Sequence, residues 1–287
     1  MTYREKYFAL SKINNPYINR TVIKTLLMDD GNYPDFTSLL CNFDKNIVNE
    51  ALLDERLQKI ENGEPMQYVL GYAYFVNSNY KVDPRVLIPR QETEVLAVSA
   101  LQLIIKTFGK DPEITIVDVG TGSGVLAIYL KEYFPRARVI ATDISRDALE
   151  VAKENAKLHN VDIEFICCNM LDEVKADIDV VISNPPYIGD KSTVSPQTLK
   201  YEPHLALFAS PKTKYYEELL SHLDEMNDKC IFAFEIGEDM EEELTELIET
   251  KYLDLGYRFE KDLYGKIRYL YVVRDDKYNV KQRCIVF

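Results

Sequence analysis

The tetrapeptide Asn184-Pro185-Pro186-Tyr187 directly follows an apolar run at residues 179–183. The side-chain oxygen of Asn184 and the carbonyl oxygen of Pro185 would each accept one N–H of a planar NH2 group. An amide nitrogen is a poor nucleophile because its lone pair is delocalised into the carbonyl, and two such acceptors would orient that lone pair. The prolines fix φ and lack a backbone N–H, so the turn is rigid. The Tyr187 ring could lie flat against an amide or a base.

A glycine-rich loop, Asp118-Val119-Gly120-Thr121-Gly122-Ser123-Gly124, lies about sixty residues earlier. Glycines let the backbone turn sharply and approach a ligand closely where a strand passes into a helix. Asp143 ends the next predicted strand, nineteen residues after Gly124, where a carboxylate can accept hydrogen bonds from both hydroxyls of a ribose. The Gly-x-Gly-x-Gly spacing differs from that of dinucleotide binders. It suits S-adenosylmethionine, which has no pyrophosphate.

At the end of the third predicted strand, Met170 would pack on the face of an adenine and Asn169 would bond its exocyclic edge. Packing at the end of a strand is the alternative for both residues. The candidate cofactor-binding residues are Gly120, Thr121, Gly122, Ser123, Gly124, Asp143, Asn169, Met170 and Asn184. The candidate catalytic residues are Asn184, Pro185 and Tyr187, with Pro186 added for substrate binding. The two segments together predict methyl transfer to an amide or amino nitrogen.

Strands and helices alternate through the part of the chain that carries these residues. The predicted strands are 114–119, 139–143, 163–167, 179–183 and 230–236, and the helices are 125–134, 147–160 and 215–225. This alternation predicts a parallel sheet with helices on both faces, and residues 257–260 and 268–273 predict a terminal antiparallel hairpin. Ligands of open α/β sheets bind beyond the carboxyl ends of the strands. The glycine loop, Asp143 and Asn184 are therefore expected in one crevice.

The first 60 or so residues read as helical. In the last helix of this region, Val48, Leu52, Leu53, Leu57 and Ile60 recur at steps of about three or four. Asn62-Gly63-Glu64-Pro65 would end that helix, and a hairpin interrupted at Asn77-Ser78-Asn79 would follow it. We expect a small helical domain at residues 1–65, a linker with a β-hairpin at 66–90 and a methyltransferase domain at 91–287.

Composition narrows the classes of function. The chain has 287 residues, of which 46% are hydrophobic, and a formal net charge of −13. No apolar run approaches the roughly 18 residues that span a membrane, and the polar N-terminus does not read as a signal peptide, so we expect a cytoplasmic protein. The negative charge argues against non-specific binding to the phosphate backbone of nucleic acids, and it favours a basic protein as partner. The five cysteines, Cys41, Cys167, Cys168, Cys230 and Cys284, show no zinc-ligand spacing and are expected to be mostly buried thiols.

The chain resembles the PrmC/HemK family of protein-(glutamine-N5) methyltransferases, which modify peptide-chain release factors. The matching segments are residues 63–71, 87–94, 118–124, 143, 184–188, 201–203 and 235–237. The resemblance implies a Rossmann-like, seven-stranded class I methyltransferase fold with a small helical N-terminal domain that helps recognise the release factor. It also implies S-adenosyl-L-methionine as cofactor and S-adenosyl-L-homocysteine as product. The implied target is the glutamine of the Gly-Gly-Gln motif of class 1 release factors, and a monomer is the family's default state.

The chain departs from the family pattern in three places. Asn169 stands where the family usually has Asp, and Met240 stands where it has Gln. Residues 208–212 replace the family's Gly-Gly-x-Asp-Gly. The first alternative function is adenine-N6 methylation of nucleic acid. Enzymes of that class use the same Asn-Pro-Pro-Tyr motif on the amino group of an adenine that has been flipped out of the duplex. The others are methylation of a glutamine in a ribosomal protein and non-catalytic binding of S-adenosylmethionine.

Overall fold

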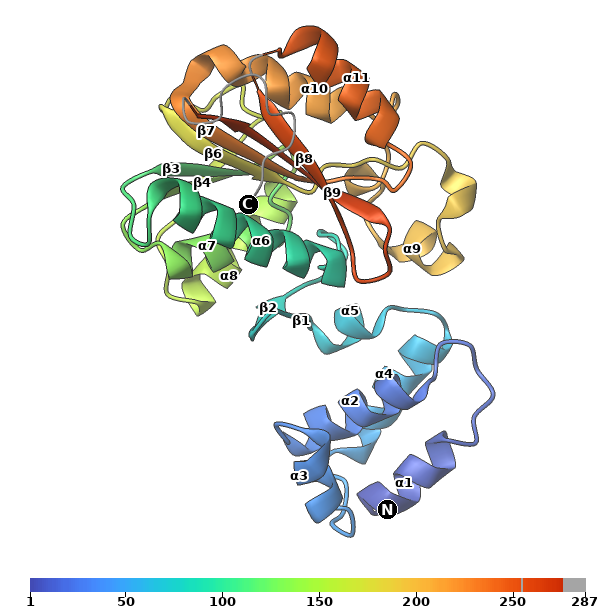
Figure 1. The fold of residues 1–287 in the computed structure, drawn as a ribbon. Helices are drawn as coiled ribbons and strands as arrows, with labels where there is room; N and C mark the ends of the chain where they lie inside the picture. Colours follow the sequence, from blue (N-terminus) through green and yellow to red (C-terminus); the bar gives the residue numbers. More distant parts are fainter. Residues whose placement is uncertain (254, 276–287) are drawn as a thin grey trace. The chain divides into compact units, whose positions relative to one another are not determined.

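The computed structural model describes residues 1–253 and 255–275, and contacts divide the chain into two compact units that meet between Gly71 and Tyr72 (Figure 1). The first unit contains helices α1 (Tyr3–Leu10), α2 (Arg20–Gly31), α3 (Phe36–Cys41), α4 (Glu50–Glu61) and α5 (Met66–Leu70). The first four begin at residues whose side chains accept a first-turn N–H, namely Thr2, Asn19, Asp35 and Asn49. The predicted helical start of the chain is confirmed.

The buried face of α4 is narrower than the sequence pattern predicted. Leu53, Leu57 and Ile60 are buried, whereas Val48 is 75% exposed and Leu52 is 38% exposed. Val48 precedes the capping residue of the helix, so the helical period does not apply to it. Leu52 lies about 100° around the helix axis from its buried neighbour in sequence, which places it outside the buried stripe.

The second unit begins with the predicted hairpin, formed by β1 (Tyr72–Phe75) and β2 (Ser78–Lys81). The interruption predicted at Asn77-Ser78-Asn79 was misplaced, because Ser78 pairs with Phe75 and Asn79 pairs with Tyr74. A two-residue turn suffices here, since such turns match the twist of the strands they join.

The large sheet has the strand order β5-β4-β3-β6-β7-β9-β8. Its strands are β3 (Thr115–Val119), β4 (Arg138–Asp143), β5 (Glu164–Cys167), β6 (Ile178–Ser183), β7 (Met226–Glu235), β8 (Gly256–Lys261) and β9 (Ile267–Arg274). The first five pair in parallel, and β9 pairs antiparallel with both β7 and β8. The predicted parallel sheet with a terminal antiparallel hairpin is confirmed.

Helices cover both faces of this sheet (Figure 1). The helices whose residues join the cores on these faces are α6 (Gln91–Phe108), α7 (Val125–Tyr133), α8 (Arg146–Leu158), α10 (Lys214–Ser221) and α11 (Glu241–Lys251). The short helix α9 (Pro196–Tyr201) contributes no buried residue to either core. Strand side chains alternate between two cores: Ile116 and Val180 pack with α6, α7 and α8, whereas Val117 and Val181 pack with α10 and α11. The predicted helix at 215–225 is shorter, because its last turn is a 3₁₀ helix at His222–Glu225.

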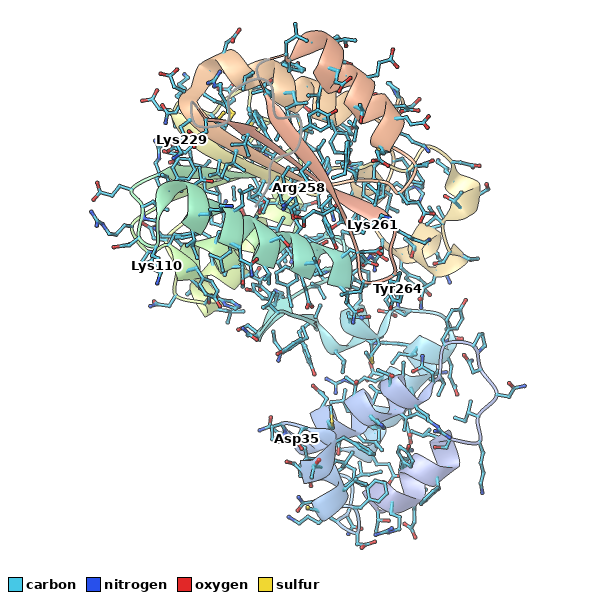
Figure 2. All side chains as sticks on the ribbon, in the orientation of Figure 1. Asp35, Lys110, Lys229, Arg258, Lys261 and Tyr264 are labelled. Carbon is cyan, nitrogen blue, oxygen red and sulfur yellow. The ribbon has the colours of Figure 1, made fainter. Side chains whose placement is uncertain are left out.

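The order of the strands reverses at β3, whose neighbours β4 and β6 both follow it in the chain. The loops after β3 and β6 therefore leave the same edge of the sheet side by side, and such a point is where doubly wound sheets bind ligands. The β8–β9 turn reaches the same edge and exposes Leu263 and Tyr264, the latter labelled in Figure 2.

Expectations from the sequence also concern membrane-spanning helices, metal-ligand clusters and cysteine burial. Within residues 1–253 and 255–275, no helix combines the length and apolar character needed to cross a bilayer. The same residues contain no cluster of three or more potential metal ligands. Cys168 and Cys230 are buried, but Cys41 and Cys167 are exposed, so the expectation of mostly buried thiols fails for these two. Cys284 lies outside the described residues.

Candidate active site

The glycine loop turns sharply after β3. Gly120, Gly122 and Gly124 all have positive φ, between 54° and 84°, which side chains disfavour. A Cβ built on Gly120 or Gly122 would meet no atom within 4 Å, whereas one on Gly124 would lie 3.1 Å from the Ala152 Cβ. The first two glycines thus keep space open for a ligand, and the third permits close packing of α7 against α8.

The Asp118 carboxylate holds the glycine loop through hydrogen bonds. Its Oδ2 accepts the Thr121 hydroxyl at 2.6 Å and the Ala127 N–H at 3.1 Å. Burial raises the pKa of Asp118 to about 7, against the opposing effect of these hydrogen bonds. Its Oδ1 is buried without a hydrogen-bond partner among the described residues, so the loop retains one unused acceptor.

Asp143 stands at the end of β4 and faces the glycine loop. Its Oδ2 accepts the Gly122 N–H at 3.0 Å and its Oδ1 accepts the Ser145 N–H at 2.8 Å. Burial raises the pKa of Asp143, while the backbone N–H groups act in the opposite direction. A carboxylate oxygen can accept more than one hydrogen bond, so each retains capacity for a ligand hydroxyl.

Asn169 and Met170 follow β5. Met170 has φ of 43°, and its carbonyl accepts the Thr142 hydroxyl at 2.9 Å. The amide nitrogen of Asn169 donates to Glu218 of α10, which leaves the amide oxygen as the atom available to a ligand. Both residues line the cavity described next, but the Asn169 contact with Glu218 was not foreseen.

A cavity joins the loops after β3, β4, β5 and β6. Of the predicted cofactor-binding residues, those that line it are Gly120, Gly122, Asp143, Asn169, Met170 and Asn184. Thr121, Ser123 and Gly124 are not among the lining residues. They hold the loop instead: Thr121 bonds Asp118, the Ser123 carbonyl accepts the Asn155 amide at 2.8 Å, and Gly124 packs on Ala152.

A second cavity adjoins the first and is lined by Asn184, Pro185, Pro186 and Tyr187. Asn184 and Pro186 line both cavities, so the Asn-Pro-Pro-Tyr turn forms their shared wall. The structure therefore brings all four predicted residues to the second cavity, and two of them, Asn184 and Pro186, also line the first.

Two further residues support this turn. The Asn184 amide nitrogen donates to the Thr93 hydroxyl at 3.1 Å, and that hydroxyl donates to Glu235 Oε2 at 2.7 Å. The Tyr187 hydroxyl donates to Glu235 Oε1 at 3.2 Å. Glu235 is 1% exposed and Thr93 is 5% exposed. Burial raises the pKa of Glu235 to about 7, although the bonds from Thr93 and Tyr187 act in the opposite direction.

Another buried carboxylate fixes the wall of the second cavity. Glu202 accepts the Ile88 N–H at 3.1 Å and pairs with the Arg90 guanidinium at 2.6 Å. Arg90 and Glu202 are 112 residues apart in the sequence, so no local spacing indicates this pair. This contact ties the segment before α6 to the loop after α9.

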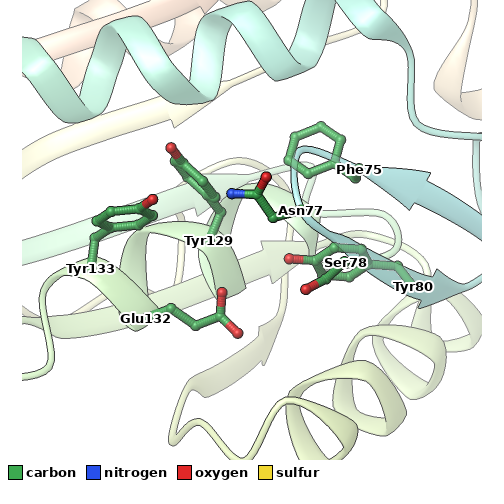
Figure 3. A pocket seen from close by; sticks show the side chains of 7 residues that line it. All are labelled: Phe75, Asn77, Ser78, Tyr80, Tyr129, Glu132 and Tyr133. Carbon is green, nitrogen blue, oxygen red and sulfur yellow. The ribbon is translucent and has the colours of Figure 1, made fainter. Parts of the chain in front are cut away.

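A separate cavity lies between the β1–β2 hairpin and α7 (Figure 3). It is lined by Phe75, Asn77, Ser78, Tyr80, Tyr129, Glu132 and Tyr133. Glu132 bonds His159, whose ring stacks on Tyr80 with centroids 4.3 Å apart. No residue of the glycine loop or of the Asn-Pro-Pro-Tyr turn lines it, so it belongs to the packing of the hairpin rather than to the site.

Comparisons with known proteins agree with this geometry. A family model described as "Methyltransferase small domain" matches residues 98–227. A release factor glutamine methyltransferase of Lactococcus lactis is 35% identical over 241 residues, covering 79% of this chain and 86% of that protein. The chain belongs to the release factor glutamine methyltransferases. A relative of that name from Staphylococcus aureus is 39% identical over 222 residues, covering 75% of this chain and 78% of its own.

Solved structures show the same fold at lower identity. A ribosomal protein L11 methylase from Lactobacillus delbrueckii is 22% identical with a TM-score of 0.50, covering 68% of this chain and 84% of that one. The hMettl16 catalytic domain is 13% identical with a TM-score of 0.56, covering 79% of this chain and 83% of that one. These likenesses confirm the class I methyltransferase fold.

This methyltransferase uses S-adenosylmethionine, and its first cavity fits that cofactor. Asp143 would offer carboxylate acceptors to ribose hydroxyls, Gly120 and Gly122 leave open space, and Met170 would offer an apolar surface to adenine. The unused Asp118 Oδ1 is a buried acceptor at the same loop. When bound, S-adenosylmethionine supplies an electrophilic methyl group on a sulfonium.

The departures from the family pattern fall in different surroundings. Met240 is fully buried in the core at the start of α11, so that side chain packs rather than reaching the site. Phe208 forms a parallel bridge with Ile188, next to the Asn-Pro-Pro-Tyr turn, and its ring lies under the Lys191 ammonium. Phe208 therefore lies next to the second cavity, which its bridge partner Ile188 lines.

Site residues that sequence reasoning did not assign a role are Thr93, Glu202 and Glu235. Each lies inside a segment that had been matched to the family, at residues 87–94, 201–203 and 235–237. In the sequence, only the match of these segments to the family pattern indicated that the three residues belong to the site. Their partners are distant in sequence, and no local spacing indicates those contacts.

The two kinds of glycine in the loop predict separable effects of alanine. Gly124→Ala should destabilise the methyltransferase by about 1–3 kcal/mol, because its Cβ would crowd Ala152 and its φ is positive. The Cβ of Gly120→Ala would meet open space, so the loss of stability should be limited to backbone strain of about 1 kcal/mol. The loss of cofactor affinity should be larger in Gly120→Ala than in Gly124→Ala, because only Gly120 lines the cavity. Urea denaturation and calorimetric titration of both variants check this. Equal loss of stability in both variants would contradict it.

Proposed function

We propose that this methyltransferase transfers the methyl group of S-adenosylmethionine to the side-chain amide nitrogen (N5) of the glutamine in the Gly-Gly-Gln motif of class 1 release factors. The main support is that Asn184 and Pro186 line both the cofactor cavity and the adjoining cavity. An acceptor amide held there would lie beside the methyl donor. The names of the relatives point to the same substrate.

In this proposal the turn positions the substrate and does little else. Asn184 Oδ1 and the Pro185 carbonyl accept the two N–H groups of the glutamine amide, and the Tyr187 ring lies against its plane. The gain comes from alignment of nitrogen with methyl, since displacement demands in-line geometry. No strong base is required, because the methylated nitrogen becomes acidic enough to lose its proton to water.

The organisation of the chain completes the proposal. Residues 1–65 would recognise the release factor, residues 66–90 would link the parts, and residues 91–287 would carry out methyl transfer. The protein would act as a monomer in the cytoplasm, without nucleic acid as a direct partner. The net charge of −13 supports a basic protein partner over a phosphate backbone.

Mass spectrometry of a class 1 release factor tests this function. Incubation with the enzyme and S-adenosylmethionine should add one methyl group to the peptide that contains Gly-Gly-Gln. A release factor in which that glutamine is replaced by alanine should gain none, which serves as the control for the site of modification.

Absence of the methyl group, with cofactor binding intact, would contradict the proposed substrate. Label found instead on a ribosomal protein would point to another glutamine. Label found on DNA or RNA would favour the adenine-N6 alternative. Binding of cofactor without turnover on any of these acceptors would favour a non-catalytic role.

A further inference from the structure

We propose that Thr93 and Glu235 are positioning residues that fix which end of the Asn184 amide faces the substrate. The inference rests on the proposed function for the identity of the acceptor amide. Thr93 is not among the residues that line either cavity, and Glu235 lines the second cavity but reaches Asn184 through Thr93. The pair reaches Asn184 from α6 and β7, elements far from it in sequence.

The direction of the hydrogen bonds follows from the number of protons available. A threonine hydroxyl has one proton, and an ionised carboxylate can only accept. The Thr93 proton must therefore point to Glu235, 2.7 Å away, which leaves the hydroxyl oxygen as an acceptor. The Asn184 group 3.1 Å from that oxygen must then be its NH2.

The planar amide leaves only one end for the cavity. With the NH2 group held by Thr93, Asn184 Oδ1 points away from Thr93 and is available to accept a substrate N–H. If the amide were flipped, its NH2 would face the substrate NH2, and two donors would oppose each other. The hydroxyl and carboxylate thus select the productive orientation of Asn184.

The same carboxylate holds the other end of the turn. Glu235 Oε1 accepts the Tyr187 hydroxyl at 3.2 Å, so one side chain anchors both Asn184 and Tyr187. Burial raises the pKa of Tyr187, so this phenol stays protonated and remains a donor. Because the Tyr216 hydroxyl donates to the Glu235 carbonyl at 2.8 Å, the residue is also held through its backbone.

The arrangement needs Glu235 to be ionised, and its surroundings bear on that charge. The residues that face it are Glu92 and Thr93 from α6, Tyr187 after β6, Tyr216 from α10, and Arg268 and Tyr269 from β9. Burial and Glu92 raise the pKa of Glu235, whereas Arg268, Thr93 and Tyr187 lower it, with a net value of about 7. Protonation would give Glu235 a proton to donate to Thr93, and the hydroxyl would no longer be forced to accept from Asn184.

Variants of Thr93 separate orientation from packing. Thr93→Val keeps the shape of the side chain but removes the hydroxyl, so kcat should fall about tenfold to a hundredfold. The cofactor affinity and the KM for the release factor should change little. Thr93→Ser keeps the hydroxyl and should restore most of kcat, although it removes a methyl group.

The pH profile tests Glu235. The wild-type kcat should rise with pH through an apparent pKa near 7, as Glu235 loses its proton. Glu235→Gln cannot ionise, so its kcat should be lower and should not rise over that range. Thr93→Ser should keep the wild-type rise, since its hydroxyl and carboxylate remain.

Stability provides a readout that needs no acceptor substrate. The native pKa of Glu235 lies above the ordinary value of 4.5, so between these values the folded chain binds more protons than the unfolded chain. Rising pH therefore lowers stability in this window, and the wild-type urea midpoint should fall between about pH 5 and 7.5. The fall should be smaller in Glu235→Gln.

The outcomes distinguish the two proposals. Lack of methylation by the wild type would defeat the proposed substrate, while the urea comparison would still test the ionisation of Glu235. Wild-type kcat in Thr93→Val, or equal loss in Thr93→Val and Thr93→Ser, would overturn the orienting role. An unchanged pH profile in Glu235→Gln, or an equal fall in its urea midpoint, would overturn the role of the carboxylate.

Discussion

Asn184→Ala is expected to lower kcat for release-factor methylation by roughly 10²–10³-fold, comparable to the loss of one oriented hydrogen-bonding group in an active site. The variant loses the acceptor for the substrate amide and the contact with Thr93. Cofactor affinity should be largely kept, because Asp143, Met170 and the glycine loop still line the first cavity. Single-turnover kinetics and calorimetric titration with S-adenosylmethionine measure the two effects separately.

Asn169→Ala is the matched control, since Asn169 is also an asparagine of the first cavity but does not line the second. It should weaken cofactor binding without a comparable loss of kcat at saturating cofactor. An unchanged turnover rate in Asn184→Ala would exclude the amide clamp. A loss of cofactor binding as large as the loss of kcat would instead make Asn184 mainly a cofactor residue.

Asp143→Ala is expected to weaken S-adenosylmethionine binding by about 10- to 100-fold, the cost of losing hydrogen bonds to a charged acceptor. The substitution also removes the acceptor of the Gly122 and Ser145 N–H groups, so the glycine loop loses a brace. Calorimetric titration with S-adenosylmethionine, in the absence of a release factor so that no methyl group is transferred, gives this affinity directly.

Asp147→Ala is the control for net charge, because Asp147 is an exposed carboxylate in the first turn of α8 and does not line the cavity. Its affinity should match that of the wild type. Asp143→Asn keeps one acceptor oxygen and should lie between the wild type and Asp143→Ala. Wild-type affinity in Asp143→Ala would remove Asp143 from the site.

Much of the fold could be predicted because its causes are local. Runs of β-branched residues marked the five parallel strands to within a residue or two at most ends, although β7 begins four residues earlier than expected, at Met226. The errors also have local reasons. Val48 precedes the cap of α4, and the β1–β2 turn is two residues long, so neither follows the period of the adjoining element.

The site was predictable where residues sit at strand ends. Gly120, Gly122, Asp143 and Asn184 follow β3, β4 and β6, and parallel strands in neighbouring positions bring their carboxyl ends together. The spacing did not reveal which way side chains in the loop would point. Thr121 and Ser123 are buried and hold the loop, although each is adjacent in sequence to Gly122, which lines the cavity.

The sequence by itself determined the chemistry of this protein, because a rigid Asn-Pro-Pro-Tyr turn and a glycine loop carry their function in a few adjacent residues. Only the tertiary structure decided how Asn184 is oriented. Its partner Thr93 is 91 residues away, and Glu235 is 142 residues from Thr93. Such contacts depend on how α6 and β7 pack around β6, and no local pattern of residues encodes that packing.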